Sequence, residues 1–217
     1  MPPSAPSRRA DGFSLVEILL VVAILAGLIS LSVPAFNRMV TASNLAAGGQ
    51  SLADQLSLAR QTAITKNAQV EVRLYQLPDP ARPDSKTPTL YRAFQSFALG
   101  SGGSETNAIA KPTFLPRSIV FLSSPTVSSL LPSGSTAPPL LVAGEAAGTR
   151  FGGSIPSAYN YMAFHFNPDG STDLDPRTAW YISLAFEKAP LGASGVPADF
   201  ITVQLDPLSG RVKLFRP

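Results

Sequence analysis

Residues 12–34 read GFSLVEILLVVAILAGLISLSVP, and this stretch decides how the rest of the chain is interpreted. Between positions 13 and 33 it contains 21 residues, and Glu17 is the only charged one. A helix needs about 20 predominantly apolar residues to cross a hydrocarbon core. The stretch therefore predicts a membrane-spanning helix with a carboxylate near its start.

The two flanks of this stretch indicate its orientation and its shape. The preceding segment, MPPSAPSRRADG, is polar and contains Arg8 and Arg9. By the positive-inside rule, we expect the N-terminus in the cytoplasm and the rest of the chain outside. At the far flank Pro34 lacks a backbone donor, which predicts a kink in the helix. That kink serves either as a simple bend at the membrane exit or as a flexible point for packing.

Helical periodicity continues beyond the apolar run as a stripe of apolar residues. The spacing between its members is 7, 4, 3 and 4, which places them on one helix face. The stripe consists of Leu45, Leu52, Leu56, Ala59 and Ala63. Polar side chains lie mostly off it, namely Asp54, Gln55, Arg60, Gln61 and Lys66. We expect one long helix from about residue 13 to about residue 66, whose second half packs on a folded domain.

After Asn67 the apolar period changes to two, as a half-buried strand requires. Val70, Val72 and Leu74 alternate with polar or amphipathic residues. Further strands are predicted at 90–99, 118–122, 161–166, 179–186, 200–205 and 212–215, separated by loops rich in Gly, Ser and Pro. The predicted fold class is α+β, with the long helix packed on an antiparallel β-domain of one curved sheet or two sheets.

Composition excludes several classes of site. The chain contains no cysteine, so a disulfide framework and a thiolate metal site are both excluded. Its net charge is +3, and the basic residues are scattered along the sequence. Nucleic-acid binding requires a clustered basic face, which the linear sequence does not contain, so no nucleic-acid partner is predicted.

The N-terminal motif Gly12-Phe13-Ser14-Leu15-Val16-Glu17 resembles the prepilin peptidase site of type IV pilins and type II secretion pseudopilins. The resemblance implies cleavage after Gly12 and N-methylation of the new terminal residue, Phe13. It also implies an assembly role for Glu17, the fifth residue of the mature chain. Pro34 occupies the position of a proline that is frequent in that family.

An independent physical argument also indicates that Glu17 needs a partner. A carboxylate in the middle of a membrane helix costs about 2.5–3.5 kcal/mol on insertion scales, and less near the helix end. Buried charge is tolerated when it is paired. In the family this glutamate pairs with the terminal amine of a neighbouring subunit, and the resemblance implies the same role here.

Two alternatives remain for the N-terminal region. In a secretory signal peptide, Arg8 and Arg9 would form the basic segment and cleavage would follow Ala35. Signal-peptide apolar regions span only about 7–15 residues, however, and this one is longer. The other alternative is a plain membrane anchor. Neither explains a Gly-Phe pair followed by a glutamate at this spacing.

The body resembles minor pseudopilins of the GspH/FimT type in three places. Ala59-Arg60, Ala63-Ile64 and Asn67 match the "AR..AI..N" end of that family's helix. Residues 166–170, FNPDG, resemble its "F.p.G" turn, and residues 206–212, DPLSGRV, resemble its "tGrv" hairpin. Both segments are also good turns on local grounds, because proline presets φ and glycine accepts positive φ. Residues 77–157 match nothing in the family.

Few residues are candidates for catalysis or for binding a metal or cofactor. His165 is the only histidine, and no catalytic or metal-binding partners can be assigned to it. Asp169, Asp173 and Asp175 form an acidic cluster that either binds calcium or is a solvated turn; their spacing does not fit an EF-hand. The glycine-rich loops lack a phosphate-binding context. We expect no enzyme activity, no cofactor and no metal site.

The resemblance divides the chain into four parts. Residues 1–12 are a leader peptide, 13–36 a transmembrane and filament-core segment, 37–68 an amphipathic helix, and 69–217 a β-rich domain with long loops at 77–88, 100–117 and 123–157. The implied function is that of a minor pseudopilin or pilin-like subunit. The implied location is the bacterial inner membrane, with a single pass and a periplasmic domain.

The implied partners are prepilin peptidase, other pilins or pseudopilins, an inner-membrane assembly platform and membrane lipid. The competing hypothesis is a membrane-anchored or secreted β-sandwich binding module.

Overall fold

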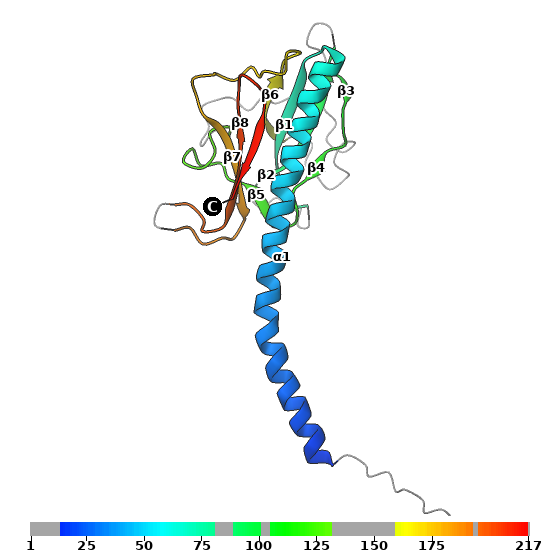
Figure 1. The fold of residues 1–217 in the computed structure, drawn as a ribbon, viewed down its shortest axis with the longest axis vertical. Coiled ribbons are helices and arrows are strands. Elements are labelled where there is room, and N and C mark those ends of the chain that lie inside the picture. Colours follow the sequence, from blue (N-terminus) through cyan, green and yellow to red (C-terminus); the bar gives the residue numbers. More distant parts are fainter. Residues whose placement is uncertain (1–13, 81–88, 101–104, 132–158, 193–194, 217) are drawn as a thin grey trace, which may run out of the picture. The chain divides into compact units, whose positions relative to one another are not determined.

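The computed structural model describes residues 14–80, 89–100, 105–131, 159–192 and 195–216, without the side chains of residues 31–35, 37–38 and 105–107. The chain forms two compact units, Met1–Ala42 and Ser43–Pro217. The single helix of the described residues, α1 (Leu15–Lys66), begins in the first unit and ends in the second (Figure 1).

The helix is continuous in its backbone through Pro34. The kink predicted there stays a prediction, because the side chain of Pro34 lies outside the described residues. In the described part of the chain, no helix is both long enough and apolar enough to cross a membrane. The predicted span 13–36 includes Phe13 and the side chains of residues 31–35, which lie outside that part.

The second unit contains one antiparallel sheet of nine strands within the described residues. Its main path runs in the order β6-β1-β2-β5-β7-β8-β9, while β3 and β4 both pair with β2. The strands are β1 (Val70–Leu77), β2 (Leu90–Leu99), β3 (Glu105–Ala108), β4 (Thr113–Phe114), β5 (Ile119–Phe121), β6 (Asn160–Phe166), β7 (Trp180–Phe186), β8 (Phe200–Leu205) and β9 (Val212–Phe215).

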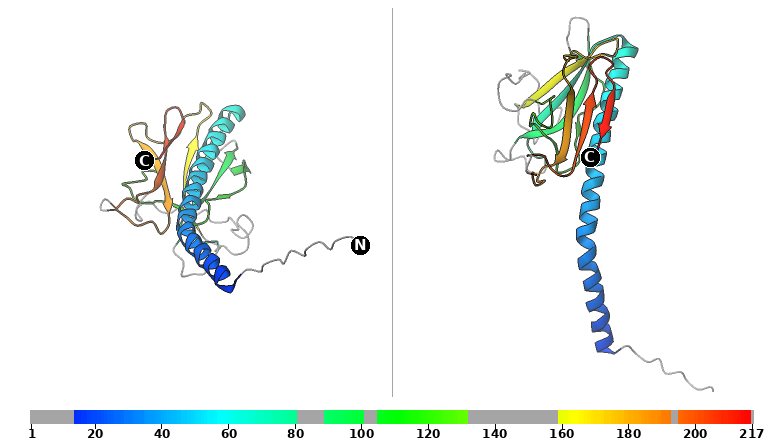
Figure 2. Two further views of the ribbon diagram at one scale, coloured as in Figure 1. Left: turned by 60° about the horizontal axis from the view of Figure 1, so that its bottom comes forward. Right: turned by 60° about the vertical axis from the view of Figure 1, so that its left-hand side comes forward.

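The second half of α1 lies against one face of this sheet, as both views of Figure 2 show. All five residues of the predicted apolar stripe are at most 2% exposed. They pack with alternate residues of the strands, including Val70, Val72, Leu74, Phe94 and Phe164. The predicted α+β architecture, with a long helix on an antiparallel sheet, is therefore confirmed, and the described strands form a single sheet.

Two glycines allow the helix to approach the sheet closely. Gly48 and Gly49 are buried between Leu45 and Leu52, where the stripe would otherwise require an apolar side chain. A Cβ atom added at Gly49 would lie 2.8 Å from Cγ2 of Ile201 in β8, and one at Gly48 would lie 3.3 Å from Cδ of Pro116. Only a residue without a side chain fits the space at Gly49.

The opposite face of the sheet carries a second, smaller apolar cluster of Tyr75, Leu77, Ala93 and Tyr161. Tyr75 and Tyr161 have ring centroids 5.8 Å apart. The residues of β1 therefore alternate between two buried environments, with Val72 and Leu74 under the helix and Tyr75 and Leu77 on the other side.

The structure differs from the prediction in the segment 100–117. That segment was expected to be a loop, but it contains β3 and β4. These strands have four and two residues, and both add to the edge of β2 through backbone pairing. Strands this short have no room for an alternating apolar pattern, so the sequence carries no signal for them.

Candidate functional site

The N-terminal end of α1 carries the residues that the sequence singled out for processing and assembly. Gly12 and Phe13 lie outside the described residues. The carbonyl oxygen of Ser14 accepts hydrogen bonds from the backbone N–H groups of Glu17 (3.0 Å) and Ile18 (3.1 Å). Ser14 is thus the N-cap of the helix, and Glu17 occupies its third position.

This placement gives Glu17 a local role that the sequence interpretation missed. A carboxylate in the first turn of a helix is stabilised by the partial positive charge of the helix N-terminus. The pattern Ser-x-x-Glu is the signature of a capping box, and Ser14 with Glu17 matches it. The side chain of Glu17 is exposed, so it is accessible to a partner from outside the chain.

The surface of the following four turns is apolar on every side. Five consecutive residues, 18–22, go once around a helix with 3.6 residues per turn, and all five are at least half exposed. Eleven large apolar side chains between positions 15 and 29 are 50–74% exposed: Leu15, Val16, Ile18, Leu19, Leu20, Val21, Val22, Ile24, Leu25, Leu28 and Ile29. A helix without a polar face, and an apolar patch this large, indicate a surface that is covered by something else.

The three segments that resemble minor pseudopilins come together in the second unit. Nε of Arg60 donates to the carbonyl oxygen of Ser209 at 2.7 Å. The backbone N–H of Thr172 donates to the carbonyl oxygen of Pro207 at 2.8 Å, which joins the two turns. The end of α1, the 166–170 turn and the 206–210 turn therefore form one junction.

Glycine is required in both turns of this junction. Gly170 and Gly210 have φ angles of 84° and 61°, which side chains rarely permit. A Cβ atom added at Gly210 would lie 2.1 Å from the carbonyl oxygen of Gly170, and one at Gly170 would lie 2.9 Å from Cδ1 of Ile64. These contacts account for the glycines of both motifs as structural residues.

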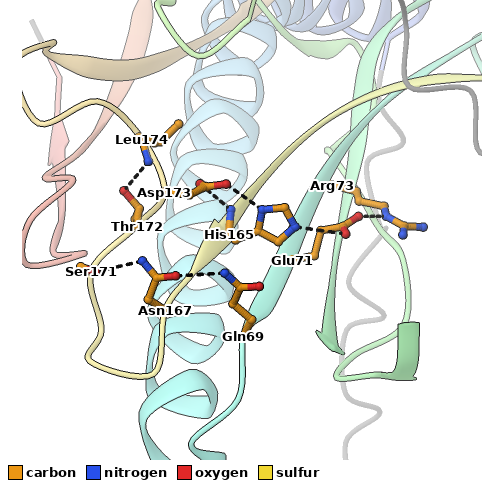
Figure 3. A network of polar contacts seen from close by, with 9 residues as sticks. All are labelled: Gln69, Glu71, Arg73, His165, Asn167, Ser171, Thr172, Asp173 and Leu174. Atoms are coloured by element: carbon orange, nitrogen blue, oxygen red, sulfur yellow. Dashed lines mark hydrogen bonds and ion pairs between the residues drawn. The ribbon is translucent and has the colours of Figure 1, made fainter. Parts of the chain in front are cut away.

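His165 belongs to a network of charged side chains on the face of the sheet that points away from α1 (Figure 3). Its Nδ1 lies 2.7 Å from Oδ2 of Asp173, and its Nε2 lies 3.3 Å from Oε2 of Glu71. Glu71 is the cross-strand neighbour of His165 in the β1–β6 pair. Glu71 also accepts a hydrogen bond from Nε of Arg73, which is 4% exposed.

The two carboxylates keep the histidine charged. Hydrogen bonds to Asp173 and Glu71 raise the pKa of His165 to about 9, against the opposing effect of burial. Burial alone would raise the pKa values of Glu71 and Asp173, but the hydrogen bonds from their partners outweigh it and lower both. Both ring nitrogens face carboxylates, so the imidazole is used as a positively charged structural link.

Arg73 completes the network from within the sheet. Its guanidinium carbon lies 4.4 Å from the ring centre of Phe97 and 4.8 Å from that of Tyr161. Stacking of a cation on aromatic faces stabilises it when it is desolvated. No partner of His165 could be predicted from the sequence, because its neighbour Glu71 is set by the register of two strands that are far apart in the chain.

The acidic cluster of the sequence has separate partners in the structure. Oδ1 of Asp169 accepts hydrogen bonds from the backbone N–H and the hydroxyl of Ser171, at 2.8 Å and 2.6 Å. Asp173 pairs with His165, and Oδ1 of Asp175 accepts from the backbone N–H of Arg177. Among the described residues, no three His, Cys, Asp or Glu side chains are grouped so that they could hold a metal ion.

No protein-family model matches the chain. No curated protein matches its sequence.

Comparison with solved structures gives three distant likenesses. Two crystal forms of the type IV minor pilin FimU of Pseudomonas aeruginosa are similar at TM-scores of 0.42 and 0.41 and 11% identity. They cover 81% and 80% of this chain, and 93% and 97% of FimU. The minor pseudopilin EpsH of the Vibrio cholerae type 2 secretion system is similar at a TM-score of 0.40 and 15% identity, over 80% of this chain and 98% of EpsH.

All three structures are minor pilin or pseudopilin subunits, the class that the N-terminal motif of this sequence resembles. Likenesses this distant identify no function, so the function of the chain follows from its own residues.

Proposed function

We propose that this chain is a minor pilin or pseudopilin subunit that is cut after Gly12 and packed by the first half of α1 into a filament. The observation that carries the proposal is the apolar surface of residues 15–29, which has no polar face and starts with a single carboxylate. A plain anchor would need the apolar surface, and helix capping alone could account for an acid at position 17, but neither would require the Gly12-Phe13 pair that precedes it.

The proposed reaction sequence begins in the bacterial inner membrane. Residues 13–36 hold the precursor with its N-terminus in the cytoplasm and its β-domain in the periplasm, as Arg8 and Arg9 predict. Prepilin peptidase removes residues 1–12, and Phe13 becomes the N-methylated terminus. An assembly platform then transfers the subunit from lipid to the filament, where other pilins cover the same apolar surface.

Glu17 supplies the selectivity of this transfer. Cleavage creates an amine at Phe13, and in the filament the carboxylate of Glu17 pairs with the amine of a neighbouring subunit. Each charge neutralises the other in apolar surroundings, where an unpaired charge is strongly unfavourable. Before assembly, the helix N-terminus itself stabilises the carboxylate, since Glu17 lies in the first turn.

The β-domain has a mechanical role in this proposal, and we propose no catalytic centre in it. Its one histidine is engaged by two carboxylates, and the motif glycines serve the junction of the turns. The buried stripe fixes the second half of α1 to the sheet, so this half of the helix and the sheet belong to one compact unit, Ser43–Pro217.

Mass spectrometry of the chain purified from its native membrane tests the proposal. We expect a mature chain that begins at Phe13 and carries one methyl group on its amine. Substitution of Gly12 by valine should leave the leader attached. A mature chain that begins at Phe36, after Ala35, would establish a signal peptide instead, and a chain that keeps residues 1–12 in the wild type would establish a plain anchor.

A further inference from the structure

The last strand of the sheet has an open edge that the proposed function does not use. In the described part of the chain, β9 lies at one end of the sheet and pairs only with β8 (Figure 2, red). Leu214 and Phe215 in this strand are 40% and 49% exposed. An open strand edge presents backbone donors and acceptors to which another extended chain can pair.

The register of the β8–β9 pair identifies the free backbone groups. Along an antiparallel pair, residues that bond to the partner strand alternate with residues whose N–H and C=O groups point to the far side. The N–H of Asp206 donates to the carbonyl oxygen of Arg211 at 3.0 Å, so Arg211 and then Lys213 face β8. The backbone groups of Val212 and Leu214 therefore point away from β8. In the part of the chain that the structure describes, no other segment bonds to them.

The side chains along β9 differ between the two faces of the sheet. Val212 packs with the core under α1, and a Cβ atom added at Gly49 of the helix would lie 3.3 Å from Cδ1 of Leu214. Arg211 and Lys213 lie on the other face, where both line a cleft of about 600 Å³ over the neighbouring strands. An added strand would therefore meet an apolar row on one face and a basic row on the other.

The positive charges of this cleft are not paired within the described residues. The strand order β7-β8-β9 brings Arg177, which precedes β7, to the same cleft as Arg211 and Lys213. All three residues are exposed, and their side chains have no hydrogen bond or ion pair in the described ranges. The one carboxylate of the lining, that of Asp206, accepts two hydrogen bonds from the turn that follows it. The lining thus has a net positive charge, which favours an acidic partner.

We propose that β9 binds an extended acidic segment of another polypeptide, which adds to the sheet as a further strand. The backbone of that segment bonds to the free groups of Val212 and Leu214. Its acidic side chains lie on the face of Lys213, and its apolar side chains cover Leu214 on the other face. This binding is independent of the processing of the helix.

Two other partners fit the edge less well. A second copy of the same edge would bring its basic row against this one, and like charges opposite each other are unfavourable. Phosphate groups of a nucleic acid supply no donors for the carbonyl groups of Val212 and Leu214. The lining of the cleft also contains no aromatic side chain on which bases could stack.

Amide hydrogen exchange of the full chain in detergent micelles tests the proposal. The probes are two short peptides of glutamate and valine with the same composition, one alternating and the other arranged in two blocks. We expect the alternating peptide to slow exchange of the Val212 and Leu214 N–H groups by about tenfold or more at saturation. The N–H of Lys213, which faces β8, should change little.

Charge variants separate the contribution of the basic row from that of the backbone. Lys213→Ala should weaken the affinity for the alternating peptide by about 2–5-fold, the effect of one exposed ion pair. Lys188→Ala removes an exposed lysine beyond the end of β7 and should have no effect. The double variant Arg211→Glu/Lys213→Glu reverses the sign of the lining, so it should bind an alternating lysine–valine peptide in place of the acidic one.

An alternating peptide that protects neither Val212 nor Leu214 would overturn the proposal. Equal binding of the block peptide would do the same, because it would show attraction between charges without strand pairing. A short DNA duplex that binds more tightly than the peptide and displaces it would also overturn the proposal and assign the cleft to nucleic acid.

Discussion

The two halves of α1 are both rich in apolar residues, yet they present them in opposite ways. In residues 45–63 the five apolar side chains of the stripe lie on one face, and each of them is at most 2% exposed because the sheet covers it. In residues 15–29 eleven large apolar side chains are distributed around the whole helix, and they are 50–74% exposed. A one-sided apolar stripe can be covered by another part of the same chain. An apolar surface around the whole helix requires a partner from outside the chain.

The largest expected effect is that of a substitution at Glu17, which tests whether a neighbouring subunit is the partner of the first half of α1. Glu17→Ala should leave membrane insertion intact but reduce incorporation into filaments by about 100-fold or more, because losing one member of a buried ion pair costs about 3–5 kcal/mol. Asp54→Ala is the matched control, since this exposed acid of the second half accepts only a hydrogen bond from Gln50 in the described residues. Quantitative immunoblotting of sheared filaments measures how much of each variant is incorporated relative to the wild type. Normal recruitment of Glu17→Ala would remove the pairing role.

The same substitution placed in each half should separate the two kinds of apolar surface. Leu56→Ala should lower the free energy of unfolding of the β-domain by about 2–5 kcal/mol, because Leu56 is 1% exposed under the sheet. Leu25→Ala, which shortens a half-exposed side chain, should change it by less than about 0.5 kcal/mol. Urea denaturation of the full chain in detergent, followed by tryptophan fluorescence, measures both. Equal losses would mean that the two halves belong to one packed core.

The charged network on the far face of the sheet should make stability depend on pH, with no contribution from the apolar half of the helix. His165 has a folded pKa of about 9, above its ordinary value of 6.5. Its contribution, roughly 1–2 kcal/mol after solvent screening, is complete below pH 6.5 and is lost as the pH rises through 9. Glu71 and Asp173 have lowered pKa values, so their contributions are lost as the pH falls below the ordinary range of a carboxyl.

Unfolding of the wild type and of His165→Gln between pH 6 and pH 10 checks this prediction. The variant should lack the alkaline loss. Because the chain has a single histidine, its imidazole resonance can be followed without assignment. A midpoint near 6.5 in the folded chain would contradict the network.

The smallest effect should have opposite signs in the two halves. Alanine favours a helix over glycine by about 1 kcal/mol. At Gly27, no atom lies within 4 Å of the added Cβ, so Gly27→Ala should raise the helix content. At Gly49 the added Cβ would lie 2.8 Å from Ile201, and overpacking costs about 1–3 kcal/mol, so Gly49→Ala should destabilise the domain by about 1 kcal/mol. Circular dichroism and thermal unfolding compare the two, and stabilisation by Gly49→Ala would contradict the close approach.

The parts of the fold that follow from local pattern were predictable from the sequence. The five stripe residues were identified by their spacing alone, and all five are buried. The strands with alternating residues, such as β1 and β8, were placed within a few positions of their bounds. The gap between Leu45 and Leu52 was visible too, but its meaning depends on Ile201, which is distant in sequence.

The rest depends on pairing that no local pattern reveals. β3 has four residues and joins the sheet only because the edge of β2 is available to it. Glu71 meets His165 because of the β1–β6 register, and Asp173 reaches the same ring from the following turn. Arg60 was placed off the apolar stripe, and its bond to Ser209 follows from the meeting of two turns.

That bond between Arg60 and Ser209 joins residues 149 positions apart, so it also concerns how the chain reaches its native state. A loop of this length is entropically unfavourable to close, and proteins dominated by such distant contacts fold slowly. During synthesis the helix emerges before β8, which covers Gly49, and before the 206–210 turn. Because β1 and β2 follow the helix directly and pack on its stripe, they can cover most of it before β8 is made, so the contact between Arg60 and Ser209 is expected to form late in folding.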